Sequence, residues 1–161
     1  DGIPNPWYYE MQELGFHYRI TDIQCALGVS QMKKLDSFVA RRRELVKRYD
    51  AAFTTSTLIR SAQTEGRDRS AHHLYPVLIN FDAAGTTRTA FLSELRRRGV
   101  IAQVHYIPVT LQPFCQRLGF VNSNFPQANA YYAQALSLPL YVDLTDEQQD
   151  SVIALLLELL G

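Results

Sequence analysis

The most chemically distinctive stretch of the sequence is Gly15–Gln24, Gly-Phe-His-Tyr-Arg-Ile-Thr-Asp-Ile-Gln. It brings the imidazole of His17 and the guanidinium of Arg19 to the start of an expected helix, where Thr21 stands in capping-box spacing with a Gln. Helix N-termini favour anions because their N–H groups and their dipole point toward them. The stretch therefore indicates an anion-binding loop. Residue types alone equally allow a purely structural role for these side chains.

A second polar group lies in an expected strand, Ile101–Val109, which contains the run Gln-Val-His-Tyr. Strand alternation would place Gln103 and His105 on one face and Val104 and Tyr106 on the other. We expect residues near the end of this strand to face a ligand. The alternative for Tyr106 is a place in the core.

The remaining histidines do not predict a metal centre. His72 and His73 are adjacent, so in a strand they would point to opposite faces and could not bind one ion together. The sequence contains no nucleophile elbow, no P-loop and no G-x-G-x-x-G. We therefore expect no metal and no nucleotide cradle of those types. A spatially assembled Ser-His-Asp or Cys-His arrangement stays open.

Two basic runs, Arg41–Arg43 and Arg96–Arg98, suggest a phosphate or nucleic-acid patch at first sight. Nearby Asp36, Glu44 and Glu94 dilute both runs. We interpret the first run as a solvated helix face. We interpret the second as a helix C-terminus whose positive charges complement the helix dipole.

Composition narrows the class of protein. In 161 residues, 47% are hydrophobic and 20% are charged, which supplies a packed core and argues against a disordered chain or a disulfide scaffold. Sixteen Lys and Arg balance sixteen Asp and Glu, so we expect neither nucleic acid nor a membrane as a partner. Cys25 and Cys115 are isolated, which fits a reducing, cytoplasmic location.

The elements that must position these residues begin with an unusually long helix. After a connecting segment over Asp1–Gly15, apolar residues recur every three or four positions from Ile23 to Phe53, and no Pro or Gly follows Gly28. The pattern predicts one helix over 22–53, about 48 Å long, which would link two bodies.

A polar loop, Thr54–Ser70, separates that helix from a small α+β unit with a few strands covered by helices. In its first strand, Pro76 indicates an edge or a bulge. The expected elements are the strand His73–Phe81, a helix begun by Thr86 or Thr87 and ended by Gly99, the strand Ile101–Val109, helices near Pro113–Leu118 and Pro126–Leu136, the strand Ser137–Leu140, and a last helix opened by the capping box of Thr145 and Gln148.

These stretches carry a resemblance to a known family. Gly15–Gly28 closely resembles the signature Gly-Phe-Asn-Tyr-Arg-x-Ser/Thr-Asp-Ile/Leu-Gln-x-Ala-Leu-Gly of the DegT/DnrJ/StrS sugar-nucleotide aminotransferases. His73–Val77, Gln103–Pro108 and Leu136–Leu140 match later landmarks in order. The Gln-Val-His-Tyr version is most similar to the branch that aminates UDP-4-keto-6-deoxy-N-acetyl-altrosamine on the pseudaminic acid route. Many relatives carry Arg where Gln103 stands.

The resemblance implies a fold-type I transaminase that depends on pyridoxal 5'-phosphate (PLP) and works as a homodimer. Such enzymes move an amino group from L-glutamate to a UDP-linked 4-keto-6-deoxy sugar. It further implies that residues 1–21 are the tail of a large PLP-binding domain, that residues 22–53 are a linking helix, and that residues 54–161 are the small C-terminal α+β domain.

The resemblance also assigns site residues. The family's PLP lysine lies upstream of the matched signature and does not correspond to Lys33, Lys34 or Lys47, so we expect no catalytic residue in this chain and no activity of the chain alone. His17 stands where relatives usually have an Asn that contacts the PLP phosphate of the partner subunit, and an imidazole N–H can donate the same hydrogen bond.

Substrate binding falls, by the same resemblance, to Gln103, Val104, His105 and Tyr106, which are expected to contact the nucleotide sugar. A second hypothesis is a standalone regulatory or ligand-binding module derived from the same small domain.

Overall fold

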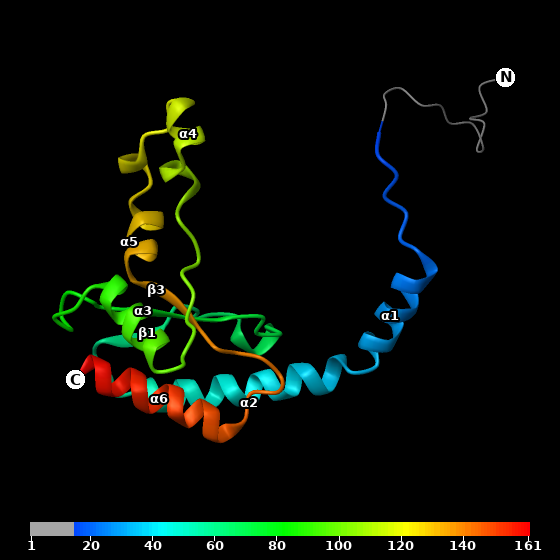
Figure 1. Ribbon diagram of the computed structural model, residues 1–161, viewed down its shortest axis with the longest axis horizontal. Coiled ribbons are helices and arrows are strands. Elements are labelled where there is room, and N and C mark those ends of the chain that lie inside the picture. The colour runs from blue at the N-terminus through cyan, green and yellow to red at the C-terminus, as the bar shows by residue number, and fades with distance from the viewer. Residues whose placement is uncertain (1–14) are drawn as a thin grey trace. The chain divides into compact units, whose positions relative to one another are not determined.

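The structure, a computed structural model, describes residues 15–161 (Figure 1). The chain divides into two compact units, Asp1–Leu35 and Asp36–Gly161. The predicted connecting segment Asp1–Gly15 lies, except for Gly15, outside the described residues. Within the described part, no helix is long and apolar enough to cross a membrane.

Helix α1, Asp22–Met32, begins at the predicted capping box. The N–H of Gln24 donates to Thr21 Oγ1 at 3.4 Å, and the N–H of Thr21 donates to Gln24 Oε1 at 2.9 Å. The two side chains thereby bond two backbone N–H groups that the first turn leaves without helical partners.

The predicted single helix over 22–53 is wrong, because α1 and α2, Leu35–Phe53, are separate helices with a turn at Lys33 and Lys34. The N–H of Lys34 donates to the carbonyl of Gln31 at 2.9 Å, a bond of the tighter i→i+3 type. Apolar spacing does not reveal this break, since both helices keep the same three-to-four period and neither Gly nor Pro marks the turn. The second compact unit begins at Asp36, in the first turn of α2.

A three-stranded antiparallel sheet forms the centre of the second unit. Val77 pairs with Leu136, and Ile59 pairs with Ile79. Because alternate residues of a strand face one side, these four side chains lie on one face of the sheet, and all four are buried. The strands, in sheet order, are β1 (Ile59–Ser61), β2 (Tyr75–Ile79) and β3 (Ala135–Leu138).

Two predictions about this sheet are wrong. First, β1 lies inside the segment that was predicted to be a polar loop, 54–70. Second, β2 is the central strand, so of the edge or bulge that Pro76 indicated, the edge is wrong. The carbonyl of Pro76 accepts a hydrogen bond from Ala62 at 2.9 Å, beyond the end of β1. In an antiparallel strand the N–H and C=O of one residue point to the same neighbouring strand. The missing N–H of Pro76 would therefore point toward Ala62, just past the end of β1, so no hydrogen bond within the β1–β2 ladder is lost.

The remaining helices largely match their predicted positions. Thr87 caps α3, and Gly99, with φ of 85°, follows its end. The capping box of Thr145 and Gln148 opens α6. The α-helices are α3 (Arg88–Arg97), α4 (Pro113–Arg117), α5 (Pro126–Gln134) and α6 (Asp146–Leu160), and the 3₁₀ turns are η1 (Arg67–Arg69), η2 (Val109–Leu111) and η3 (Asn122–Asn124).

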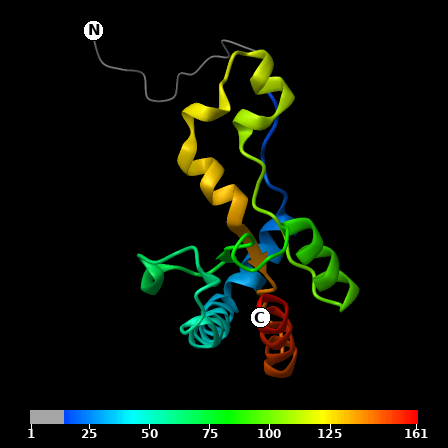
Figure 2. The same cartoon turned by 90° about the vertical axis from the view of Figure 1, so that its left-hand side faces the viewer.

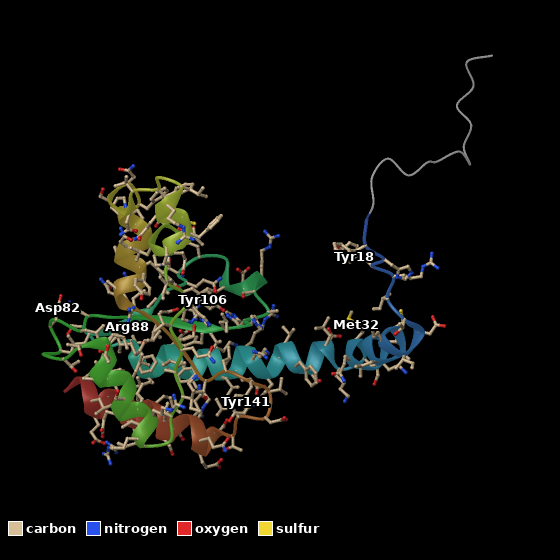
Figure 3. The ribbon with its side chains drawn as sticks, turned by 45° about the horizontal axis from the view of Figure 1, so that its top comes forward. Tyr18, Met32, Asp82, Arg88, Tyr106 and Tyr141 are labelled. Atoms are coloured by element: carbon tan, nitrogen blue, oxygen red, sulfur yellow. The ribbon has the colours of Figure 1, made fainter. Side chains whose placement is uncertain are left out.

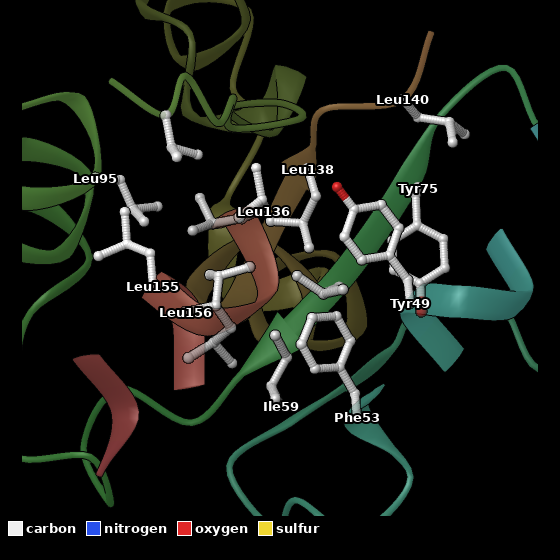
Figure 4. Packing of buried hydrophobic residues seen from close by; sticks show 14 of the residues in the cluster. Tyr49, Phe53, Ile59, Tyr75, Leu95, Leu136, Leu138, Leu140, Leu155 and Leu156 are labelled. Atoms are coloured by element: carbon white, nitrogen blue, oxygen red, sulfur yellow. The ribbon is translucent and has the colours of Figure 1, made fainter. Parts of the chain in front are cut away.

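The core lies between the sheet and the helices α2, α3 and α6 (Figure 4). The ring of Tyr49 in α2 stacks on Phe53 with centroids 5.9 Å apart and on Tyr75 of β2 with centroids 4.8 Å apart. The Tyr49 hydroxyl donates to the carbonyl of Pro139 at 2.9 Å, so this buried aromatic residue keeps its polar end bonded. One side chain thus joins α2 to β2 and to the residue that follows β3.

The α2–α6 contact is centred on a polar residue. Gln149 is fully buried, and its Nε2 donates to the carbonyl of Leu45 at 2.7 Å. Its Oε1 accepts from Arg48 Nε at 3.0 Å, and Arg48 also pairs with Asp150 at 2.6 Å. Because both ends of the amide are bonded, the cost of burying it is offset.

The run Arg41–Arg43 is not the solvated helix face that was predicted. Successive side chains on a helix point about 100° apart, so three arginines in a row reach three different segments. Among the described residues, Arg42 bonds backbone alone, since its Nη1 lies 3.0–3.2 Å from three carbonyl oxygens. The partners are Glu44, Leu144 O and Asp146 for Arg41, the carbonyls of His72, His73 and Leu140 for Arg42, and the carbonyls of Asp68 and Ser70 for Arg43.

We predict that Arg42→Met lowers the free energy of unfolding by about 2 kcal/mol, because partly buried carbonyl oxygens lose a charged donor. Arg96→Met, the same change in the other basic run, should cost less than about 0.5 kcal/mol, since Arg96 is exposed. Urea unfolding of both variants measures the difference. Equal losses would show that Arg42 does not tie these segments together.

His72 predicts a pH dependence of stability. Burial lowers the pKa of its imidazole, and the charge of Arg67 adds to this effect. With the lower pKa in the folded state, the unfolded chain takes up the proton first as the pH falls, so stability is lost below the ordinary histidine pKa of about 6.5. His72→Asn removes this titration and tolerates the residue's φ of 49°. Urea unfolding between about pH 7 and pH 5 should show a smaller loss for the variant than for the parent, and identical losses would contradict the assignment.

Candidate functional site

The predicted strand Ile101–Val109 is wrong except at Gln103. The N–H of Gln103 donates to Ser137 O at 3.0 Å, and its carbonyl accepts from the Ser137 N–H at 2.7 Å, which makes a single bridge to β3. A longer ladder would pair residue 101 with Pro139, which has no N–H, and residue 105 with Ala135, where α5 has only just ended.

Beyond the bridge the chain forms an arm, residues 104–134, that rises from the sheet and returns to it (Figures 1 and 2). The arm contains η2, α4, η3 and α5, and α5 leads directly into β3. The two ends of the arm therefore meet beside the same strand.

A pocket of about 430 Å³ lies at the base of this arm. Tyr106 contributes an exposed aromatic ring from the outgoing segment (Figure 3), and Tyr132 contributes a half-buried ring from α5. The pocket is lined by Val104, Tyr106, Ile107, Gln112 and Tyr132.

A cation holds Tyr132 in place. The guanidinium carbon of Arg88, the first residue of α3, lies 4.2 Å from the centroid of the Tyr132 ring. Arg88 Nη1 also donates a hydrogen bond to the Tyr132 carbonyl. The same side chain thus fixes both the ring and the backbone of this residue.

The four predicted substrate residues take different positions. Val104 and Tyr106 line the pocket. The alternation expected of a strand does not hold, because the rings of His105 and Tyr106 lie side by side with centroids 4.5 Å apart. His105 Nδ1 is hydrogen-bonded to Ser137 Oγ. Gln103 is exposed and contributes its backbone bridge rather than a wall of the pocket.

Gln112, Tyr132, Arg88 and Ser137 were missed by sequence reasoning. The aromatic pair Tyr131–Tyr132 was visible in the sequence, but nothing local connects it with residue 106. Only the return of the arm to β3 brings the two segments together.

The residues that line the pocket favour ligand binding over catalysis. Two aromatic rings offer faces to a sugar or a base, and phenol and amide groups offer hydrogen bonds to hydroxyls and carbonyls. None of the five lining residues carries a carboxylate or an ammonium group. The arrangement can therefore orient a polar ring-containing ligand.

His17 lies in the first compact unit, in the extended segment before α1, and is exposed. The rings of its neighbours Phe16 and Tyr18 meet edge to face with centroids 6.1 Å apart. The capping box bonds the N–H groups of Thr21 and Gln24, two of the N–H groups that could otherwise face an anion at the start of α1.

Residues 15–161 do not assemble a metal site. They contain no group of three or more His, Cys, Asp or Glu that could hold a metal ion. His72 and His73 precede β2 rather than lying in it. Lys33, Lys34 and Lys47 are exposed, and none of them lines the Tyr106 pocket.

Comparison with known proteins identifies the origin of this arrangement. The model of the DegT/DnrJ/EryC1/StrS aminotransferase family matches residues 2–157, which confirms the family predicted from the sequence. The chain is 36% identical over 149 residues to the spore coat polysaccharide biosynthesis protein SpsC of Bacillus subtilis. It is 32% identical over 143 residues to the UDP-4-amino-4,6-dideoxy-N-acetyl-beta-L-altrosamine transaminase of Helicobacter pylori.

The fold is also similar to a solved structure. Spr1654 of Streptococcus pneumoniae, described as a sugar aminotransferase and solved in a PLP form, superposes with a TM-score of 0.83 at 30% identity. The match covers 96% of this chain and 39% of Spr1654. The alignments cover 91% of this chain for SpsC and 89% for the Helicobacter enzyme, and the chain spans 38% of the length of each. The predicted fold class, α+β with a small sheet covered by helices, is confirmed, and the sheet is antiparallel.

We predict that Arg88→Met lowers the free energy of unfolding by about 1–2 kcal/mol, because it removes both the contact with the Tyr132 ring and the bond to its carbonyl. Arg117→Met is the matched control, since Arg117 lies farther from its aromatic partner, 5.9 Å from the centroid of Phe114. Urea unfolding compares the two. A larger loss in the control would contradict the role given to Arg88.

Proposed function

Because the chain belongs to the DegT/DnrJ/EryC1/StrS aminotransferase family, we propose that it is the substrate-binding, C-terminal part of a PLP-dependent sugar-nucleotide aminotransferase. The reaction would move an amino group from L-glutamate to the 4-keto carbon of a UDP-linked 4-keto-6-deoxy sugar. The observation that carries the proposal is the pocket between Tyr106 and Tyr132, whose rings and hydroxyls suit a nucleotide sugar.

Within this proposal, each residue binds or orients. Tyr106 and Tyr132 supply ring faces and hydroxyl groups to the nucleotide sugar, and Gln112 supplies an amide. Val104 and Ile107 exclude water from the apolar side of the pocket. His105, half-buried and in contact with the Tyr106 ring, offers an imidazole nitrogen beside it.

PLP, when bound, supplies the electron sink that amino transfer requires. The lysines of this chain do not fit its covalent anchor, whereas the exposed imidazole of His17 fits a phosphate contact through an N–H donor. We assign His17 to the PLP phosphate of the partner subunit in a homodimer. The exposed apolar side chains of Ile23 and Met32 on α1 support a helix that packs against another surface. The chain alone is then expected to bind substrate without transaminating it.

The proposal predicts that this chain binds UDP-N-acetylglucosamine, used as a stable probe, and that Tyr106→Ala or Tyr132→Ala weakens binding about tenfold, which is ~1.4 kcal/mol for a lost aromatic face. Tyr141→Ala is the control, because Tyr141 is exposed and lies outside the pocket. Isothermal titration calorimetry measures all four proteins.

Equal weakening in the Tyr141 variant would contradict the location of the site. Absence of binding to UDP-N-acetylglucosamine and to UDP would contradict the proposed substrate class. That result would favour the second hypothesis, a ligand-binding module built on the same small domain.

A further inference from the structure

Ser137 is a buried hydroxyl residue in the middle of β3, with an exposed fraction of 5%. Its neighbours Leu136 and Leu138 belong to the core. Because successive side chains alternate, Ser137 lies on the opposite face of the sheet, where its side chain meets His105 of the segment after Gln103. Its backbone N–H and C=O are both bonded to Gln103, so the backbone of Ser137 is held in place.

The side chain of Ser137 meets His105. Among the described residues, the hydrogen-bond contact of Ser137 Oγ is with Nδ1 of His105. A hydroxyl carries one proton to donate, and leaving a buried donor without an acceptor is costly. If the imidazole donated from Nδ1, the Ser137 proton would have no acceptor. The favourable arrangement therefore has the hydroxyl donating to Nδ1.

A neutral imidazole has one N–H and one bare nitrogen, so accepting at Nδ1 places the proton on Nε2. We propose that Ser137 is a positioning residue for ligand binding, which fixes His105 as the Nε2–H tautomer and offers that N–H to an acceptor oxygen of the nucleotide sugar. This inference rests on the proposed function only for the identity of the ligand. The His105 ring lies tilted against the Tyr106 ring, at an interplanar angle of 54°, so its orientation also supports one wall of the pocket.

The tautomer can be read directly from ¹⁵N–¹H correlation spectra of the histidine-labelled chain at about pH 8, where a histidine of ordinary pKa is neutral. His105→Gln assigns the His105 signals. In the parent chain, His105 should show the Nε2–H pattern. In Ser137→Ala it should show a mixture of tautomers, and Ser137→Thr, which keeps the hydroxyl, should restore the parent pattern.

Two controls isolate the effect. Ser151→Ala removes a hydroxyl that donates to Glu147 O on α6 and should leave the His105 signals unchanged. The signals of His72 and His73 report whether Ser137→Ala keeps the fold. An Nδ1–H pattern in the parent chain would overturn the proposal, and this holds even if a variant fails to fold. Identical His105 patterns in the parent and in a folded Ser137→Ala would also overturn it.

Binding gives a second readout. Ser137→Ala should weaken binding of UDP-N-acetylglucosamine about fivefold, the size expected when one hydrogen bond is lost. Failure of the parent chain to bind this probe would count against the proposed function, while the tautomer spectra would still decide the role of Ser137. Unchanged affinity in a variant that has lost the fixed tautomer would overturn the link between Ser137 and the ligand.

Discussion

Two backbone hydrogen bonds between Gln103 and Ser137 determine where a pocket can form in this chain. They hold the start of the arm against β3, and α5 brings the end of the arm back into the same strand. A single short strand therefore receives both ends of a segment of about thirty residues, and Tyr106 and Tyr132 meet at its base. The bridge, together with the bond between His105 and Ser137, fixes the outgoing segment on the strand into which α5 leads.

The strand that carries the bridge is itself held by α2. Tyr49 stacks on Tyr75 and bonds the carbonyl of Pro139, just past the end of β3. Arg42 donates hydrogen bonds to the carbonyl of His72, which precedes β2, and to the carbonyl of Leu140, which follows β3. The polar contacts of α2 thus set the ends of the two strands, while the aromatic stack sets the distance between helix and sheet. Because both ends of the arm lie at β3, these contacts of α2 also help to position the pocket.

Features governed by nearby residues could be predicted from the sequence. Capping boxes act over three residues, so the starts of α1 and α6 followed from their spacing. Features governed by distant partners could not. β1 is too short to show a period and becomes a strand only by pairing with β2. The sequence predicted a solvated position for Arg42. Its acceptors are backbone carbonyls, and because every residue has one, the sequence does not show which of them Arg42 bonds.

The candidate site shows the same division. Family resemblance pointed to residues 103–106, and the structure places Val104 and Tyr106 in the pocket, but Gln112 and Tyr132 became visible only in three dimensions. In the proposed site, the nucleotide sugar lies between these two segments. Amide and side-chain NMR signals followed during titration with UDP give the decisive test. We expect shifts concentrated at the five pocket residues and at the adjacent ring of His105. Shifts concentrated instead at the separate cavity beside Tyr141 and Val152 would contradict it.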